Sequence, residues 1–270
     1  MARKDGEFLH GAFGKHIYKV INGKQFVYPK PVPGTMKQTN NTKKAANIFA
    51  MAAMIARYFR KSLFNMINRF GDNGMINRLT ALFNQSLRDS RDPDSGVYRF
   101  EADSFIGLEG FEFNTDSKLS QLMLNRPSIT VNEGILTVTV PANRIDSELK
   151  FPESSFECEV WISVSLIRLE EVLKSTDVES QLITVTRDKQ SLEQQELNFM
   201  VPDGCLCIVS TFLQYANYSK NKPLIINNKK LNPGQINKAL ITPGIYQQND
   251  QLVWEKMIIN PVKKKRRNKG

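Results

Sequence analysis

The chain has 270 residues, a formal net charge of +10 and a hydrophobic fraction of 41%. That hydrophobic fraction is enough for a packed core, so wholesale disorder is excluded. The three cysteines (Cys158, Cys205 and Cys207) exclude a disulfide framework and indicate a reducing compartment, so we expect a cytoplasmic or virion-associated (assembly-associated) protein.

The positive charge is concentrated at the two ends of the chain. Residues 1–70 contain thirteen Lys and Arg against two acids, a net charge of +11, and residues 261–270 contain six Lys and Arg and no acid. The segment between them carries −7. This asymmetry predicts a polyanionic partner or an acidic protein surface. The start of the chain lacks the apolar region of a secretory signal, and the longest apolar run is too short for a bilayer, so no membrane partner is expected.

Residues 1–38 are predicted to form a basic arm with a Pro-rich linker. Within the arm, residues 17–28 predict a β-hairpin, because Asn22-Gly23 is the preferred pair of a type I′ turn. β-Branched and aromatic residues flank this turn on both sides. The stretch 29–34 can continue neither a strand nor a helix and predicts an extended linker.

Residues 39–96 are predicted to form a helical hairpin followed by a polar linker. Residues 39–42 offer several N-cap side chains, and the run that follows has apolar residues at intervals of three and four. This stripe consists of Ile48, Ala52, Ile55, Phe59, Leu63, Met66 and Phe70. Gly71–Gly74 is expected to stop the first helix, and residues 75–87 to form a second, antiparallel one.

A second apolar stripe broadens the face of the first predicted helix. It consists of Phe49, Ala53, Ala56, Phe64 and Ile67. So wide a face exceeds what one short antiparallel helix covers, which predicts a further partner. We expect Phe49, Phe59 and Phe64 to contact that partner, which is either the β region or another copy of the chain.

From residue 97 onward the apolar period shortens to two, and residues 97–260 are predicted to form an antiparallel β-sandwich. The candidate strands are 97–101, 128–131, 135–140, 156–168, 181–186, 197–201, 205–215 and 252–259. No βαβ alternation is present, so a doubly wound nucleotide-binding fold is not expected. The predicted fold class is therefore α+β: an N-terminal hairpin arm, a two-helix hairpin, an antiparallel sandwich and a basic disordered tail at 261–270.

Several short motifs stand out along the chain: Met1-Ala2-Arg3-Lys4, Gly11, Gly14-Lys15, Tyr18-Lys19, Asn22-Gly23-Lys24, Arg78-Leu79 and the run from Gly107 to Asn114. With these motifs the chain resembles an uncharacterised bacterial family, a domain of unknown function with a basic Gly/Lys-rich start, a helical middle and a β-sandwich-like end. The resemblance covers roughly residues 1–114 in motifs and the rest in architecture. It implies a fold organisation but no activity, because the family has none to transfer.

The residues needed for common catalytic chemistries are missing from the β region. Its Ser, Cys and Asp residues have no His among them, because His10 and His16 both lie in the arm. Cys205 and Cys207 are two residues apart, whereas zinc ligands follow a C-x₂₋₄-C spacing with two further Cys or His nearby. We therefore predict no catalytic residue, no metal, no cofactor and no enzyme activity.

Two weaker patterns have simpler explanations. Gly11 to Lys15 hints at a phosphate-binding loop, but His16 stands where a P-loop has Ser or Thr, so a flexible turn is expected. The acidic pairs Glu170–Glu171 and Glu109–Glu112 are interpreted as solvated surface charge, since nothing in the sequence brackets a cleft around them.

The basic ends carry the main functional hypothesis, a non-enzymatic protein that binds nucleic acid through phosphates. Its cations are Lys15, Lys19, Lys24 and Lys30 in the arm, beside Phe13, Tyr18, Phe26 and Tyr28, and Lys263, Lys264, Lys265, Arg266 and Arg267 in the tail. The alternative is a structural subunit of a larger phage-like or filamentous assembly, a homo-oligomer whose arm and helices contact neighbouring copies. A third possibility is that the charged ends only keep the protein soluble. The choice between DNA, RNA and an acidic protein as partner stays open.

Overall fold

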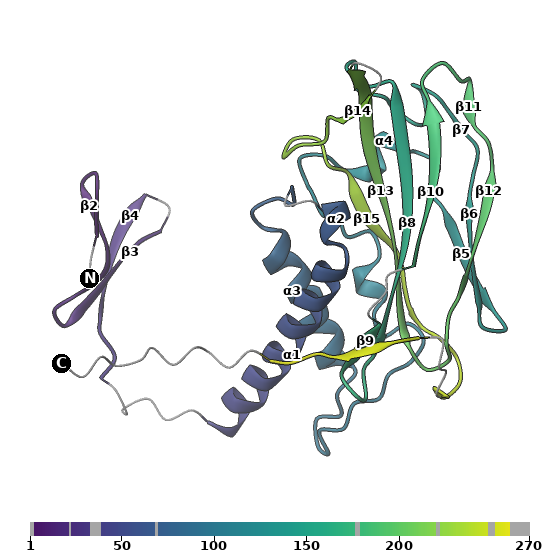
Figure 1. Ribbon diagram of the computed structural model, residues 1–270. Helices are drawn as coiled ribbons and strands as arrows, with labels where there is room; N and C mark the ends of the chain where they lie inside the picture. The colour runs from purple at the N-terminus through teal and green to yellow at the C-terminus, as the bar shows by residue number, and fades with distance from the viewer. Residues whose placement is uncertain are drawn as a thin grey trace. The chain divides into compact units, whose positions relative to one another are not determined.

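The computed structural model of the chain describes residues 3–21, 23–32, 39–67, 70–175, 179–219, 222–247 and 252–259. It divides into two compact units, Met1–Ala46 and Asn47–Gly270. Both units are built mainly from antiparallel strands, and helices add to the second, which makes the chain an α+β protein (Figure 1). Within the described ranges, no helix combines the length and the apolar character needed to cross a membrane.

The first unit contains a four-stranded antiparallel sheet in sequential order. Its strands are β1 (Arg3–Asp5), β2 (Phe8–Phe13), β3 (His16–Ile21) and β4 (Lys24–Pro29). Strands β3 and β4 pair with Ile21 opposite Lys24, as the predicted hairpin requires. Gly23 has a φ of +73°, the left-handed conformation that a type I′ turn needs, while Asn22 lies outside the described residues. The sheet of the arm is therefore larger than the predicted hairpin, because β1 and β2 extend that hairpin to four strands.

Three helices follow the arm along the chain. They are α1 (Asn40–Ser62), α2 (Phe64–Ile67) and α3 (Met75–Asp89). Thr39 Oγ1 accepts a hydrogen bond from the Thr42 backbone N–H at 3.2 Å, which confirms an N-cap in the predicted segment. The first helix ends at Ser62, earlier than expected. Ser62 Oγ donates to the Phe59 carbonyl at 2.7 Å, a local bond of the kind that competes with the helical ladder.

The second unit holds three further sheets. Its strands are β5 (Ser128–Asn132), β6 (Ile135–Val140), β7 (Asn143–Arg144), β8 (Glu157–Arg168), β9 (Leu173–Ser175), β10 (Glu179–Thr186), β11 (Ser191–Leu192), β12 (Gln195–Met200), β13 (Leu206–Ser219), β14 (Lys222–Ile225), β15 (Gly234–Ile241) and β16 (Trp254–Lys256), with the short helices η1 (Ile106–Leu108) and α4 (Leu119–Leu122). The largest sheet has the order β14-β13-β8-β9-β16, with β10 beside β8 and β15 beside β13. Strands β12, β6 and β5 form a second sheet, and β11 and β7 a third.

Most strands lie where the sequence predicts them. Those expected at 128–131, 135–140, 156–168, 181–186, 197–201 and 205–215, and part of 252–259, are present with slightly shifted ends. The segment 97–101 is not a strand, since only Tyr98 forms an isolated bridge, with Arg91. Strands β14 and β15 were not predicted.

Buried side chains form two clusters that share the central strands β8 and β13. The first cluster includes Phe59, Phe83, Phe105, Phe113 and Phe212 and joins α1 and α3 to the large sheet. The second joins the same sheet to β6 and β12, and Figure 1 shows these strands and the helices on opposite sides of β8 and β13. Because both faces are covered, residues 162–167 of β8 are buried without alternation.

The predicted domain boundaries at 38/39 and 96/97 stay predictions, beside a division into two compact units at 46/47. The boundary between them lies within α1, and residues 47–89 share a core with the β region. The physical reason is the wide apolar face of α1, whose buried residues Ile55 and Phe59 pack into the core of the large sheet. The predicted tail, 261–270, lies outside the described residues.

Candidate nucleic-acid interface

One face of the β3–β4 hairpin collects cations and aromatic rings. The strand register places Lys19 opposite Phe26 and Ile21 opposite Lys24, and Tyr28 lies two residues beyond Phe26. Directly paired residues, and residues two apart on one strand, project from the same side of a sheet. Lys19, Lys24, Phe26 and Tyr28 therefore share one face, which we call the Lys19 face.

The two aromatic rings of the Lys19 face, Phe26 and Tyr28, are stacked. Their centroids are 6.4 Å apart, and the ring planes differ by 22°. Phe26 is 41% exposed and Tyr28 is 43% exposed, and the Lys19 and Lys24 side chains are also exposed. Large apolar groups gain by leaving water, so two exposed rings beside two cations are available for contact with a partner.

The other predicted cations and aromatic residues of the arm are not part of the Lys19 face as defined above. The Lys30 backbone N–H donates to the Lys15 carbonyl at 2.6 Å, which brings these two residues together at one end of the hairpin. Tyr18 pairs with Val27 and so projects from the face opposite Lys19, and it does not join the stacked rings. Phe13 is 67% exposed. The tail cations Lys263, Lys264, Lys265, Arg266 and Arg267 lie outside the described residues.

The three phenylalanines predicted as a partner interface fall into two groups. Phe49 and Phe64 lie exposed on α1 and α2, whereas Phe59 is 1% exposed. The Phe59 ring packs against Phe83 and Phe113, with centroids 6.1 and 6.2 Å away. Phe59 is therefore a core residue and cannot contact another copy, because the covering layer that its stripe requires is supplied by the chain itself.

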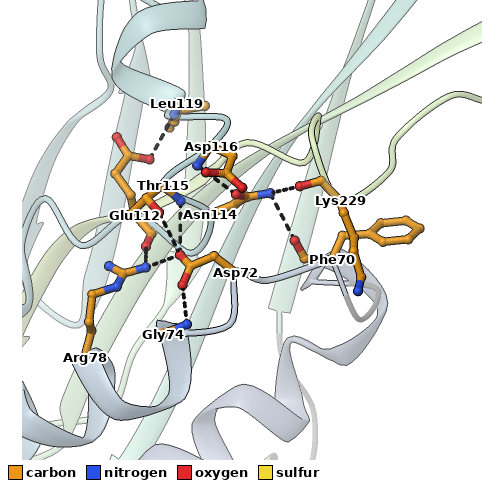
Figure 2. A network of polar contacts seen from close by, with 10 residues as sticks. All are labelled: Phe70, Asp72, Gly74, Arg78, Glu112, Asn114, Thr115, Asp116, Leu119 and Lys229. Atoms are coloured by element: carbon orange, nitrogen blue, oxygen red, sulfur yellow. Dashed lines mark hydrogen bonds and ion pairs between the residues drawn. The ribbon is translucent and has the colours of Figure 1, made fainter. Parts of the chain in front are cut away.

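A network of polar contacts lies between the α2–α3 connection and the segment after η1 (Figure 2). The Asp72 carboxylate accepts hydrogen bonds from the backbone N–H of Gly74 at 2.7 Å and of Thr115 at 3.1 Å, and it forms an ion pair with Arg78. The same arginine donates to the Glu112 carbonyl at 3.1 Å. Burial alone would raise the pKa of Asp72, but the backbone N–H groups of Thr115 and Gly74 and the Arg78 guanidinium together lower it below its ordinary value.

The polar side chains of this network form their hydrogen bonds with other groups of the same chain. The Glu112 carboxylate, predicted to be solvated, is 9% exposed and accepts from the N–H groups of Leu119 at 2.9 Å and Ser120 at 3.2 Å and from Gln235 Nε2 at 2.8 Å. Asn114 is fully buried and donates to the Phe70 carbonyl at 3.0 Å and to the Lys229 carbonyl at 2.8 Å. Groups with all their bonds made inside the fold stabilise it and have little capacity left for a substrate.

The cysteines of the second unit are poorly suited to nucleophilic chemistry. All three cysteines are buried, and burial raises the pKa of Cys158 and Cys207 well above the ordinary thiol value and that of Cys205 to about 12. A thiol held neutral is a poor nucleophile and a poor metal ligand. No group of three or more His, Cys, Asp or Glu that could hold a metal ion occurs among the described residues.

No protein family model, no curated protein and no solved structure matches this chain. The resemblance to a bacterial domain of unknown function therefore stays a prediction, and the Lys19 face and the polar network are interpreted from their own geometry.

Proposed function

We propose that this chain is a non-enzymatic nucleic-acid-associated protein that binds phosphates through its basic arm and its C-terminal tail. The observation that carries the proposal is the Lys19 face, where cross-strand pairing puts two lysines beside two stacked, exposed rings. Lysines neutralise phosphates, and rings accept bases, which is the combination that nonspecific single-strand binders use. A cytoplasmic or virion-associated location is part of the same proposal.

The proposed ligand is single-stranded, because the rings can stack only on bases that are unpaired. Stacking tolerates every base, so sequence preference should be weak. The charge distribution agrees: the segment 71–260 carries −7 and repels a polyanion, whereas the first 70 residues carry +11. Binding is therefore expected at the basic ends and not on the acidic β region.

The test is the salt dependence of binding to a fluorescent thymidine decamer, measured by anisotropy with the full chain. Each phosphate contact on a single strand contributes a slope of about 0.7 in log affinity against log salt. The double substitution K19Q/K24Q should therefore lower the slope by about 1.4. The matched control is K118Q/K189Q, which removes two exposed lysines from the second unit and should leave the slope unchanged. An equal effect of both pairs, or none from the first, would overturn the proposal.

The rings are tested separately from the charges. F26A and Y28A should each weaken binding by about 1–3 kcal/mol if each ring stacks on a base, with no change in salt slope. V27A, on the opposite face of the same strand, is the control. Duplex DNA of the same sequence should bind more weakly than the single strand and should not respond to either ring substitution.

The finer fold features belong to the same proposal. We infer that the β region is a two-sheet sandwich, supported by the cluster that joins β6 and β12 to β8 and β13. We also infer that α1 and α3 form a hairpin, supported by the edge-to-face contact of Phe59 with Phe83.

A structural subunit of a larger phage-like or filamentous assembly is the second candidate. It is favoured by β14, an edge strand whose four residues are all exposed, with Leu224 at 56% and Ile225 at 48%. Exposed apolar edge strands are templates for pairing with another chain. Light scattering in 0.5 M NaCl separates the two candidate functions. An oligomer of the unchanged protein that persists at this salt concentration and dissociates in the L224K variant supports assembly. A monomer in both the unchanged protein and the L224K variant contradicts assembly.

A further inference from the structure

The second half of α1 carries a cationic groove whose lining residues belong to neither the arm nor the tail. Arg57, Arg60 and Lys61 are spaced by three and four residues and so lie on one side of the helix. With Tyr58 and Phe64 they line an open groove of about 470 Å³. The signal was present in the sequence as three cations within five residues, but the apolar stripe of the same helix obscured it.

Among the described residues, these three cations have no acidic ion-pair partner. The charge of Lys61 acts on the Glu255 carboxylate, but Glu255 is already paired with another lysine, with 3.0 Å between Lys174 Nζ and Glu255 Oε2. Like charges at these helical spacings repel one another, so the groove has an excess of positive charge that an anion would relieve.

Arg60 is the most constrained member of the groove. Its Nε is buried, and within the described residues it has no hydrogen-bond partner. Burial and the neighbouring charge of Arg57 both lower the pKa of Arg60. A buried donor without an acceptor is costly, and a guanidinium is suited to bidentate recognition of a phosphate.

The described end of the chain lies at this groove. Arg57 Nη2 donates to the Ile258 carbonyl at 3.2 Å, and the Ile258 N–H donates to the Tyr58 hydroxyl at 3.1 Å. Figure 1 shows the yellow C-terminal segment running to α1. The basic run from Lys263 to Arg267 follows in the sequence and lies outside the described residues.

We propose that Arg57, Arg60 and Lys61 bind a backbone phosphate of the nucleic acid, as a contact on the second unit in addition to the arm. This inference rests on the proposed function for the source of the phosphate. A phosphodiester is favoured over the carboxylate of an acidic protein, because a guanidinium and an ammonium side by side match its charge-dense tetrahedral oxygens, and the open groove lets a strand continue on both sides.

The experiment uses the full chain with K19Q/K24Q, so that the arm contacts are weakened, and the thymidine decamer as the probe. R60Q should lower the salt slope by about 0.7 and the affinity about fivefold at 0.1 M salt. R60K should restore the salt slope, because lysine keeps the charge, but little of the affinity, because lysine lacks the planar fork. The matched control R99Q removes an exposed arginine elsewhere on the second unit and should have no effect.

A second readout follows Arg60 directly. The Nε–Hε NMR signal of Arg60 should shift on addition of the decamer and shift far less with poly-glutamate of equal charge. Equal shifts with both polyanions would overturn the phosphate assignment in favour of an acidic protein partner. If the Arg60 signal does not move and R60Q binds the decamer as tightly as R99Q does, the proposal that this groove binds nucleic acid is overturned. Neither result bears on the proposal that the arm binds nucleic acid. That proposal would fail if K19Q/K24Q had the same salt slope as the unchanged protein.

Discussion

The arm and the second unit use the same kinds of residue in opposite ways. Phe26 in the arm is 41% exposed, whereas Phe59 in α1 is 1% exposed. The difference comes from the core: no described residue of the arm sheet belongs to either buried cluster, whereas the strands β8 and β13 are covered on both faces. A ring in the second unit therefore stabilises the fold, while a ring in the arm is free to stabilise a complex.

The polar groups of the two regions differ in the same sense. In the second unit Glu112 and Asp72 find their donors within the fold. In the arm Lys19 and Lys24 face solvent, and among its described residues no ion pair occurs. Substitutions at Glu112 and Asp72 are thus expected to change stability, and those at Lys19 and Lys24 to change binding.

The largest expected effect is on the core of the second unit. F59A should lower the free energy of unfolding by about 3–5 kcal/mol, because it removes a ring packed on two others and leaves a cavity. F49A, on the exposed side of the same helix, should cost less than about 1 kcal/mol. Urea unfolding followed by circular dichroism measures both. Equal losses would mean that α1 does not share a core with the large sheet.

A smaller effect on the free energy of unfolding is expected from substitution of Glu112, whose carboxylate accepts three hydrogen bonds within the fold. E112Q keeps the shape of the side chain but turns one acceptor into a donor that faces another N–H. The loss of stability should be about 1–3 kcal/mol, the cost of leaving a buried polar group unpaired. E196Q, at an exposed position of β12, is the matched control and should be neutral. A neutral E112Q would show that the donors around it find water instead.

The smallest effect concerns the pH dependence of stability. Because the folded-state pKa of Asp72 lies below its unfolded-state value, its charge stabilises the fold above the unfolded-state pKa of about 3.9, and that contribution is lost as the pH falls through the folded-state pKa. D72N should therefore be less stable than the unchanged protein at pH 7, and the difference should vanish at the lowest pH. A difference that stays constant with pH would assign the role to shape and not to charge.

Local signals in the sequence account for much of the fold. The Asn22-Gly23 pair predicts a two-residue turn, and such a turn fixes the register that puts Lys19 opposite Phe26. Strand β6 was recognisable because Leu136, Val138 and Val140 alternate with exposed or half-buried residues, as its burial pattern confirms.

Features that depend on distant partners were missed for a physical reason. Strand β15 begins with glycine and carries Gln235 and Asn237, residues that lower β propensity. Inside the fold these polar side chains bond to Glu112 and Thr211, and those partners cannot be read from the neighbourhood in the chain. The burial of Glu112 escaped prediction for the same reason, since Gln235 lies 123 residues away.

Nucleic acid is proposed to bind to one face of the arm. Chemical-shift mapping of the isotope-labelled full chain with the thymidine decamer reports on each face separately. We expect the signals of Lys19, Lys24, Phe26 and Tyr28 to move with the largest amplitude, while those of Tyr18 and Val27 on the opposite face change little. Equal changes on both faces, or changes confined to β14 and the acidic β region, would contradict this proposal.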